Sequence, residues 1–159
     1  MLAAVLALLG TGCAKDKQEE TTSVKVVKNA NLLQENVPDF NGYKKSTVDI
    51  NNDGYPDQVK YFDPETKELR YITRDLNFDH LIDVYEYYKN GELVKDEVDL
   101  DYDGKIDLVS EYSDGVATKQ HYSINFEGVL SGTYSFDADG NLIRVERDTD
   151  GDGKMDTFE

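Results

Sequence analysis

Short stretches in which apolar and polar residues alternate occupy most of the chain from about residue 41 onward. The clearest are residues 83–88, 92–98, 107–112, 118–122 and 141–147. Alternation with a period of two, together with many β-branched and aromatic residues, is typical of strands that bury one face. Stretches of about six residues match a common strand length and are too short for stable helices. The pattern predicts an all-β fold.

An internal repeat separates these stretches. Nine-residue acidic segments begin at Asp49, Asp75, Asp99 and Asp148, so the spacings are 26, 24 and 49 residues, the last being about twice the others. A weakly acidic copy begins at Ser123, where the period of about 25 residues places one. We number these segments loops one to five in chain order: residues 49–57, 75–83, 99–107, 123–131 and 148–156.

Each period also contains the sequence signals of a β-hairpin. An aromatic residue stands thirteen positions after each of the first four loop starts, at Phe62, Tyr88, Tyr112 and Phe136, and turn-forming residues follow it. A second strand-like stretch then leads into the next loop. Because every connection is short, we expect an antiparallel meander of repeated hairpins, with tight turns along one edge and the acidic loops along the other.

The acidic loops have the spacing of a calcium-binding loop. Such a loop supplies oxygen ligands from positions 1, 3, 5, 7, 9 and 12, with glycine at position 6 and a backbone carbonyl at position 7. The predicted ligands are Asp49, Asn51, Asp53, Tyr55 and Asp57 in loop one; Asp75, Asn77, Asp79, Leu81, Asp83 and Glu86 in loop two; Asp99, Asp101, Asp103, Lys105 and Asp107 in loop three; and Asp148, Asp150, Asp152, Lys154, Asp156 and Glu159 in loop five.

Position 12 differs between the loops. Glu86 and Glu159 fill it in loops two and five, as in an EF-hand, whereas Lys60 and Ser110 stand there in loops one and three. Those two sites would depend on the position 9 aspartates and on water. Loop two also has His80 where glycine is expected, and histidine tolerates the left-handed backbone conformation better than most residues.

Loop four keeps the framework of the repeat but not its charge. Gly128 and Leu130 occupy positions 6 and 8, while the ligand positions carry Ser123, Asn125, Glu127 and Ser131. We expect this loop to bind no ion. We expect loop five, in contrast, to clamp the strand over residues 141–147 when it binds one.

The loop pattern D-x-[DN]-x-D-G-x-x-D resembles the calcium loops of EF-hands and dockerins, which lie between helices, and those of integrin-type and thrombospondin type 3 repeats, which do not. The predicted flanks here are strands. Residues 134–148 also resemble the tyrosine-aspartate repeats of bacterial wall-associated proteins. The resemblance implies calcium as the cofactor and the ligand roles given above. Magnesium is an alternative ion, although it demands a compact octahedral site, and a solvated acidic surface with Asx turns is an alternative to any metal.

The charge of the chain favours bound cations. Asp and Glu outnumber Lys and Arg by 33 to 17, for a net charge of −16, which argues against nucleic acid and anionic lipid surfaces as partners. Fourteen of the 33 acidic residues lie in loops one, two, three and five, where they repel one another. Four calcium ions would bring the net charge to about −8.

The beginning of the chain resembles a bacterial lipoprotein. An apolar run over residues 2–9, too short to span a membrane, is followed by small residues and by the only cysteine, Cys13. Residues 9–13 resemble a lipobox, although Gly10 stands where that family prefers leucine and no basic residue precedes the apolar run. The resemblance implies an acylated Cys13 and, from Ala14, the outer membrane. An ordinary secretory signal is the alternative.

These features predict three regions: a signal peptide over residues 1–12, a lipidated cysteine and flexible tether over 13–40, and a calcium-loop β-hairpin repeat domain over 41–159. We expect a calcium-binding, lipid-anchored protein of the cell envelope with a structural or binding role. The alternative is a calcium-dependent envelope enzyme or inhibitor fragment, but we predict no catalytic residues because no nucleophile with a neighbouring base is recognisable. The tyrosine-rich strand faces could bind a protein or a glycan.

Overall fold

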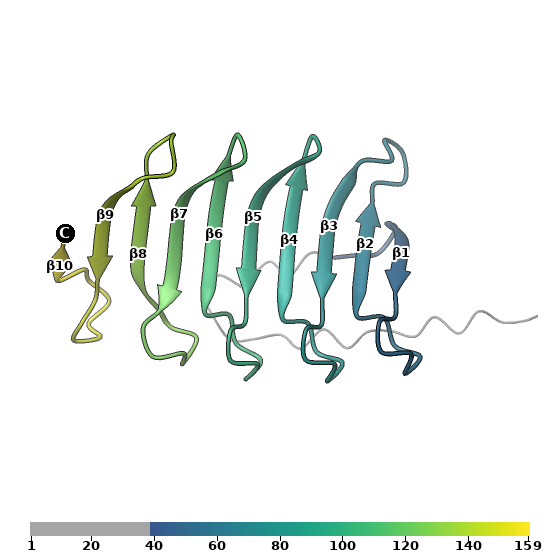
Figure 1. The fold of residues 1–159 in the computed structure, drawn as a ribbon, viewed down its shortest axis with the longest axis horizontal. Helices are drawn as coiled ribbons and strands as arrows, with labels where there is room; N and C mark the ends of the chain where they lie inside the picture. Colours follow the sequence, from purple (N-terminus) through teal and green to yellow (C-terminus); the bar gives the residue numbers. More distant parts are fainter. Residues whose placement is uncertain (1–38) are drawn as a thin grey trace, which may run out of the picture.

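The computed structural model describes residues 39–159, which form one antiparallel sheet of ten strands and contain no helix (Figure 1). Strand order in the sheet follows chain order, so the predicted all-β meander is confirmed. The predicted signal peptide, Cys13 and nearly all of the predicted tether lie outside the described residues. Within the described part, no helix is long and apolar enough to cross a membrane. The strands are β1 (Lys44–Val48), β2 (Gln58–Phe62), β3 (Leu69–Arg74), β4 (Val84–Lys89), β5 (Glu92–Val98), β6 (Leu108–Ser113), β7 (Val116–Ser123), β8 (Leu130–Phe136), β9 (Leu142–Arg147) and β10 (Thr157–Phe158).

The two edges of the sheet differ in the way that the repeat predicts. Tight turns join β2 to β3, β4 to β5, β6 to β7 and β8 to β9 along the upper edge of Figure 1, and the five loops follow one another along the lower edge. The five stretches singled out by alternation are observed as β4, β5, β6, β7 and β9, with bounds that differ by two residues at most.

A β-bulge recurs beside the repeating aromatic residue. The register shifts immediately before Phe62, Tyr88, Tyr112 and Phe136, once in each hairpin. A bulge adds one residue to one strand and increases the local twist. Because it falls at the same place in every repeat, successive hairpins acquire a similar twist, and the loops stay aligned along the lower edge.

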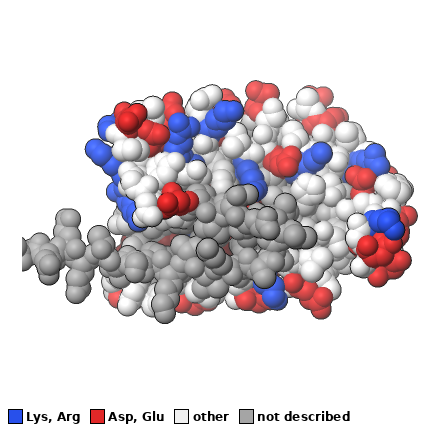
Figure 2. Space-filling view, turned by 180° about the vertical axis from the view of Figure 1, so that it is seen from behind, with Lys and Arg blue, Asp and Glu red and all other residues white. Residues whose placement is uncertain are grey.

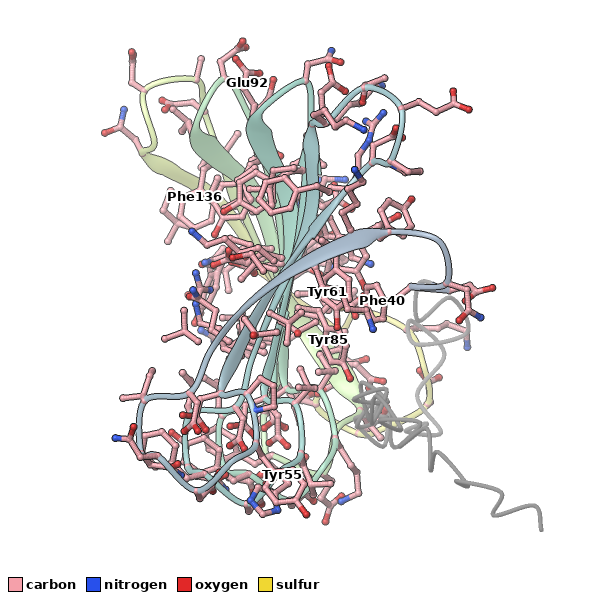
Figure 3. The ribbon with its side chains drawn as sticks, turned by 90° about the vertical axis from the view of Figure 1, so that its right-hand side faces the viewer. Phe40, Tyr55, Tyr61, Tyr85, Glu92 and Phe136 are labelled. Atoms are coloured by element: carbon pink, nitrogen blue, oxygen red, sulfur yellow. The ribbon has the colours of Figure 1, made fainter. Side chains whose placement is uncertain are left out.

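Apolar side chains are buried on both faces of the sheet: Tyr61, Tyr85 and Val109 on one, which we call face A, and Ile72, Val84 and Val145 on the other. Phe40, Tyr61 and Tyr85 lie on face A and Phe136 on the other face (Figure 3). The Phe40 ring stacks on Tyr61 with a centroid distance of 4.1 Å and meets Tyr71 edge-on at 5.5 Å. Phe40, which the sequence places in the tether, is therefore packed against the sheet.

Position 8 of the loops connects them to this packing. Tyr85, Ile106 and Val109 form a buried cluster, and Ile82 and Leu130 pack against it. Ile82, Ile106 and Leu130 are the position 8 residues of loops two, three and four. Burial of these three side chains adds to the apolar area that the sheet removes from water. It also holds loops two, three and four against face A.

Candidate metal centres

All five loops share one backbone conformation. The residues at positions 4 and 6 of every loop have positive φ, between 57° and 92°: Asn52, Gly54, Phe78, His80, Tyr102, Gly104, Phe126, Gly128, Gly151 and Gly153. His80 has φ 71°, as expected for a residue in the place of glycine. The left-handed residue at position 4 was not predicted, because neither its amino-acid type nor the ligand spacing marks it.

Neighbouring loops are joined by backbone hydrogen bonds. The N–H of position 1 donates to the carbonyl of position 9 in the preceding loop, at 2.8 Å from Asp75 to Asp57, 2.8 Å from Asp99 to Asp83, and 2.7 Å from Ser123 to Asp107. The loops therefore form a stack that extends the sheet beyond the ends of the strands.

The position 1 carboxylate organises each acidic loop. In loop three, Asp99 accepts hydrogen bonds from the backbone N–H of Tyr102 at 2.8 Å and of Gly104 at 2.7 Å. The corresponding aspartates of loops one, two and five accept the same pair of bonds from positions 4 and 6. These N–H groups hold the loop backbone around the side chains at positions 3 and 5.

The other acidic positions repeat their contacts as well. The side-chain oxygen at position 3 accepts a hydrogen bond from the backbone N–H of position 5, and the side-chain oxygen at position 5 accepts one from the N–H of position 7. In loop three these bonds are 3.2 Å and 2.9 Å long. Position 9 accepts from the N–H of position 2, as Asp107 does from Leu100 at 3.1 Å. The same three contacts are present in loops one, two and five.

Two of the position 9 aspartates are buried with one oxygen unpaired. Asp57 is 2% exposed and Asp107 is 0% exposed. In each, Oδ2 accepts backbone N–H groups, while Oδ1 is buried and has no hydrogen-bond partner among the described residues. A buried carboxylate oxygen without a partner is costly, and a cation coordinated by that oxygen would offset the cost.

Carboxylates meet closely at two of the loops. Oxygens of Asp99, Asp101 and Asp103 lie within 4.8 Å of one another, and so do oxygens of Asp148, Asp150 and Asp156; each group could hold a metal ion. Loops one and two have asparagine at position 3, so they contribute a neutral amide oxygen there instead of a carboxylate. Figure 2 shows acidic side chains along the lower edge of the molecule, where the loops lie.

The two predicted position 12 ligands both contact other side chains in the structure. Glu86 lies in β4, where its carboxylate pairs with Arg74 and accepts a hydrogen bond from the Tyr88 hydroxyl at 2.9 Å. Glu159 is 3.6 Å from Arg147. In an EF-hand a helix returns position 12 to the ion, whereas here a strand begins after position 9 and runs away from the loop. Glu86 therefore has a partner other than loop two, and the Glu159 carboxylate lies near the Arg147 side chain.

The electrostatics of the acidic groups differ from one loop position to another. Burial raises the pKa of Asp83, Asp99 and Asp107 above the ordinary value, and backbone N–H donors offset part of this effect. The pKa of the exposed Asp53 is shifted in the opposite direction. The N–H of Tyr55 and then the His80 side chain lower its pKa.

These shifts predict that the metal-free protein loses stability as the pH rises. A carboxyl group whose pKa is raised on folding holds its proton more tightly in the folded state, so stability decreases from about pH 4, the unfolded value, up to the folded pKa. Thermal unfolding of protein stripped on a chelating resin should show a midpoint that falls as the pH rises above about 4. Asp107→Asn should flatten the fall, and a midpoint that rises instead would contradict the burial of these groups.

Loop four has few of the contacts described above. The N–H of Glu127 donates to Asn125 at 3.4 Å, and the Ser123 hydroxyl donates to the same oxygen at 3.4 Å. Ser123 has no carboxylate to receive the N–H groups of positions 4 and 6, and an additional bulge falls between Tyr122 and Ser123. Its backbone still resembles the other loops, so the conformation does not require the carboxylates.

A contact between loops one and two involves the unusual histidine. His80 Nε2 lies 3.0 Å from Asp53 Oδ2, and the His80 ring stacks on Tyr55 at 4.1 Å. His80 replaces the glycine of loop two, yet its side chain reaches the position 5 carboxylate of loop one. No local sequence signal predicts this contact, because the residues are 27 positions apart. His121 lies opposite Thr133 on the neighbouring strand, 2.9 Å from its hydroxyl.

Comparison with known proteins adds no family. No family model matches the chain, and no curated protein is similar to it. A mutant of S. aureus TarM in complex with Fondaparinux, alpha-GlcNAc-glycerol and UDP is 13% identical over 65% of this chain and 19% of that chain, with a TM-score of 0.47. Accessory secretory protein 1, 2 and 3 of Streptococcus pneumoniae is 15% identical over 71% of this chain and 21% of that chain, with a TM-score of 0.43. The chain spans about a fifth of the length of these structures.

Proposed function

We propose that the protein is a calcium-binding module of the cell envelope in which loops one, two, three and five each hold one ion. The observation that carries this proposal is the unpaired, buried Oδ1 of Asp57 and of Asp107. Each belongs to a loop in which backbone N–H groups hold both oxygens of the position 1 carboxylate and one oxygen of the side chains at positions 3 and 5. A cation is the partner that the remaining oxygens of such a loop favour.

Calcium fits this ligand set better than magnesium. The ligands would be side-chain oxygens at positions 1, 3, 5 and 9 and the carbonyl at position 7, all of them hard oxygen donors. A nine-residue loop that offers five or more such groups suits six to eight ligands, whereas magnesium keeps several waters and an octahedral shell. Outside the cytoplasm, modules of this kind can work at about 10⁻⁴ to 10⁻³ M calcium. Calorimetric titration with calcium tests the assignment, and its heats should persist in excess magnesium.

The ions would have a structural role. Backbone hydrogen bonds join each loop to the next, so an ion that stiffens one loop also restrains the strands on either side and the neighbouring loop. Loops one, two, three and five each carry three or four aspartates that repel one another, and a divalent ion would remove most of that repulsion. The module would then be a rigid, calcium-stabilised sheet.

The proposed address rests on the sequence alone, since Cys13 lies outside the described residues. A cysteine that carries several acyl chains would hold the protein stably on a membrane, because each buried CH₂ contributes about 0.8 kcal/mol. Cys13→Ser should therefore move the protein from the membrane fraction to the soluble fraction of the cell, as detected by immunoblotting. Ser23→Ala, in the predicted tether, is the control and should stay with the membranes. Retention of the Cys13→Ser variant there would rule out the anchor.

A further inference from the structure

The loop edge exposes apolar side chains in a regular pattern. Position 2 holds Ile50, Leu76, Leu100 and Ile124 in loops one to four, and all four side chains are between 45% and 62% exposed. Single exposed apolar residues are common on protein surfaces, whereas a contiguous exposed group marks an interaction site. The recurrence of exposed apolar side chains at one loop position therefore indicates an interaction site.

A second loop position is also apolar and exposed. Position 4 holds Phe78, Tyr102 and Phe126, which are 42% to 48% exposed and share the left-handed backbone conformation. Equivalent residues in successive loops are two strands apart, or about 9.6 Å along the sheet. Because the loops stack with one conformation along the lower edge of Figure 1, the residues of each position recur at a regular spacing along that edge.

Loop four contributes most to this apolar surface. Ile124, Phe126 and Val129 are all exposed, Val129 by 62%, and Glu127 is its only carboxylate. Of loops one to four, it is the one with the fewest charges to desolvate. A loop with few carboxylates and several exposed apolar side chains is suited to enter an apolar medium.

The chemistry of the neighbouring loops suits a phospholipid headgroup. Loops one and three have no carboxylate at position 12, and in loop two Glu86 pairs with Arg74, so ions in these loops would keep open coordination positions, which a phosphate oxygen can fill. Loops one and two carry three aspartates each, so a bound calcium ion leaves one negative charge beside the cation. A zwitterionic headgroup has the matching phosphate and ammonium groups, whereas an anionic surface would be repelled by a chain whose net charge remains about −8 with four ions bound.

We propose that the loop edge, with calcium bound, docks onto a zwitterionic phospholipid bilayer and inserts the apolar side chains of positions 2 and 4 into its interface. This proposal rests on the proposed calcium function. Calcium is required because the unfilled loops carry the uncompensated aspartates to the membrane surface. The docking is separate from any acyl chain on Cys13.

Sedimentation with vesicles tests the docking. The full chain with Cys13→Ser, which removes any acyl anchor, is mixed with phosphatidylcholine–phosphatidylethanolamine vesicles in millimolar calcium or in chelator. We expect binding in calcium, release by chelator, and weaker binding to vesicles rich in phosphatidylglycerol. Equal binding in chelator, or a preference for phosphatidylglycerol, would overturn the proposal.

A matched pair of variants locates the contact. Replacing Ile124 and Phe126 by serine should weaken vesicle binding by at least about tenfold, since two exposed apolar side chains no longer enter the bilayer. Ile143→Ser is the control, because Ile143 is 63% exposed but lies in β9, away from the loops. Unchanged binding by the double variant would overturn the docking. Calcium heats measured in parallel separate the two proposals: normal heats without vesicle binding refute the docking alone, and absent heats refute the calcium function.

Discussion

Removal of calcium should lower the midpoint of thermal unfolding strongly. A ligand that binds only the native state stabilises it by about 2.7 kcal/mol per independent site at a hundredfold excess over Kd. For a domain of this size, that gain moves the midpoint by roughly 10 °C per site. The physical source is the relief of repulsion among aspartates and the pairing of the buried oxygens of Asp57 and Asp107.

Differential scanning calorimetry in millimolar calcium and in chelator measures this effect. Magnesium at the same concentration is the control and should raise the midpoint much less. Equal midpoints in calcium and in chelator would mean that the loops are only a solvated acidic surface with Asx turns, which is the alternative that the sequence leaves open.

Asp99→Ala should abolish the site of loop three and destabilise the protein even without calcium. The substitution removes a predicted ligand, which costs about 2.7 kcal/mol of calcium-dependent stabilisation under the same conditions. It also removes the acceptor of the Tyr102 and Gly104 N–H groups. Groups left without a partner cost about 1–3 kcal/mol each when buried, and less here because the loop is partly solvated.

Ser123→Ala is the matched control for Asp99→Ala. Ser123 occupies position 1 of loop four, and its hydroxyl makes only the long contact to Asn125. This variant should keep the full calcium count and nearly the full unfolding midpoint. If Asp99→Ala bound as many ions as the wild type, or if Ser123→Ala lost one, the ligand assignment of the loops would be wrong.

The strands and their order could be predicted because the signals are local. Alternation along residues 92–98 predicts both ends of β5 correctly. The repeat period predicts that loops and turns lie on opposite edges of the meander. The side-chain contacts within each loop follow the same logic. Positions 1, 3 and 5 meet in loop three and positions 1, 3 and 9 in loop five, all within nine residues of chain, so the spacing alone predicts that they lie close together.

Other features depend on contacts between repeats, which the loop pattern does not encode. Glu86 fits position 12 by count, but the alternation of β4 and the neighbouring Arg74 give its carboxylate another partner. The burial of Asp57 and Asp107 depends on how the loops stack. The contact of His80 with Asp53 joins two repeats.

The exposed apolar residues at loop positions 2 and 4 are not predicted by the calcium-loop pattern, which specifies only the ligand positions and positions 6 and 8. Position 2 and position 4 residues such as Leu100 and Phe126 look like ordinary loop members in one copy. Only the shared backbone conformation and the stacking of the loops place them at a regular spacing along one edge.

The number of bound calcium ions tests the central claim most directly. Native mass spectrometry of the full chain, combined with calorimetric titration, should count four ions at comparable affinity, one for each of loops one, two, three and five. Loop four should add none, because Glu127 is its only carboxylate. A count of zero, or a fifth ion bound as tightly as the others, would contradict the account.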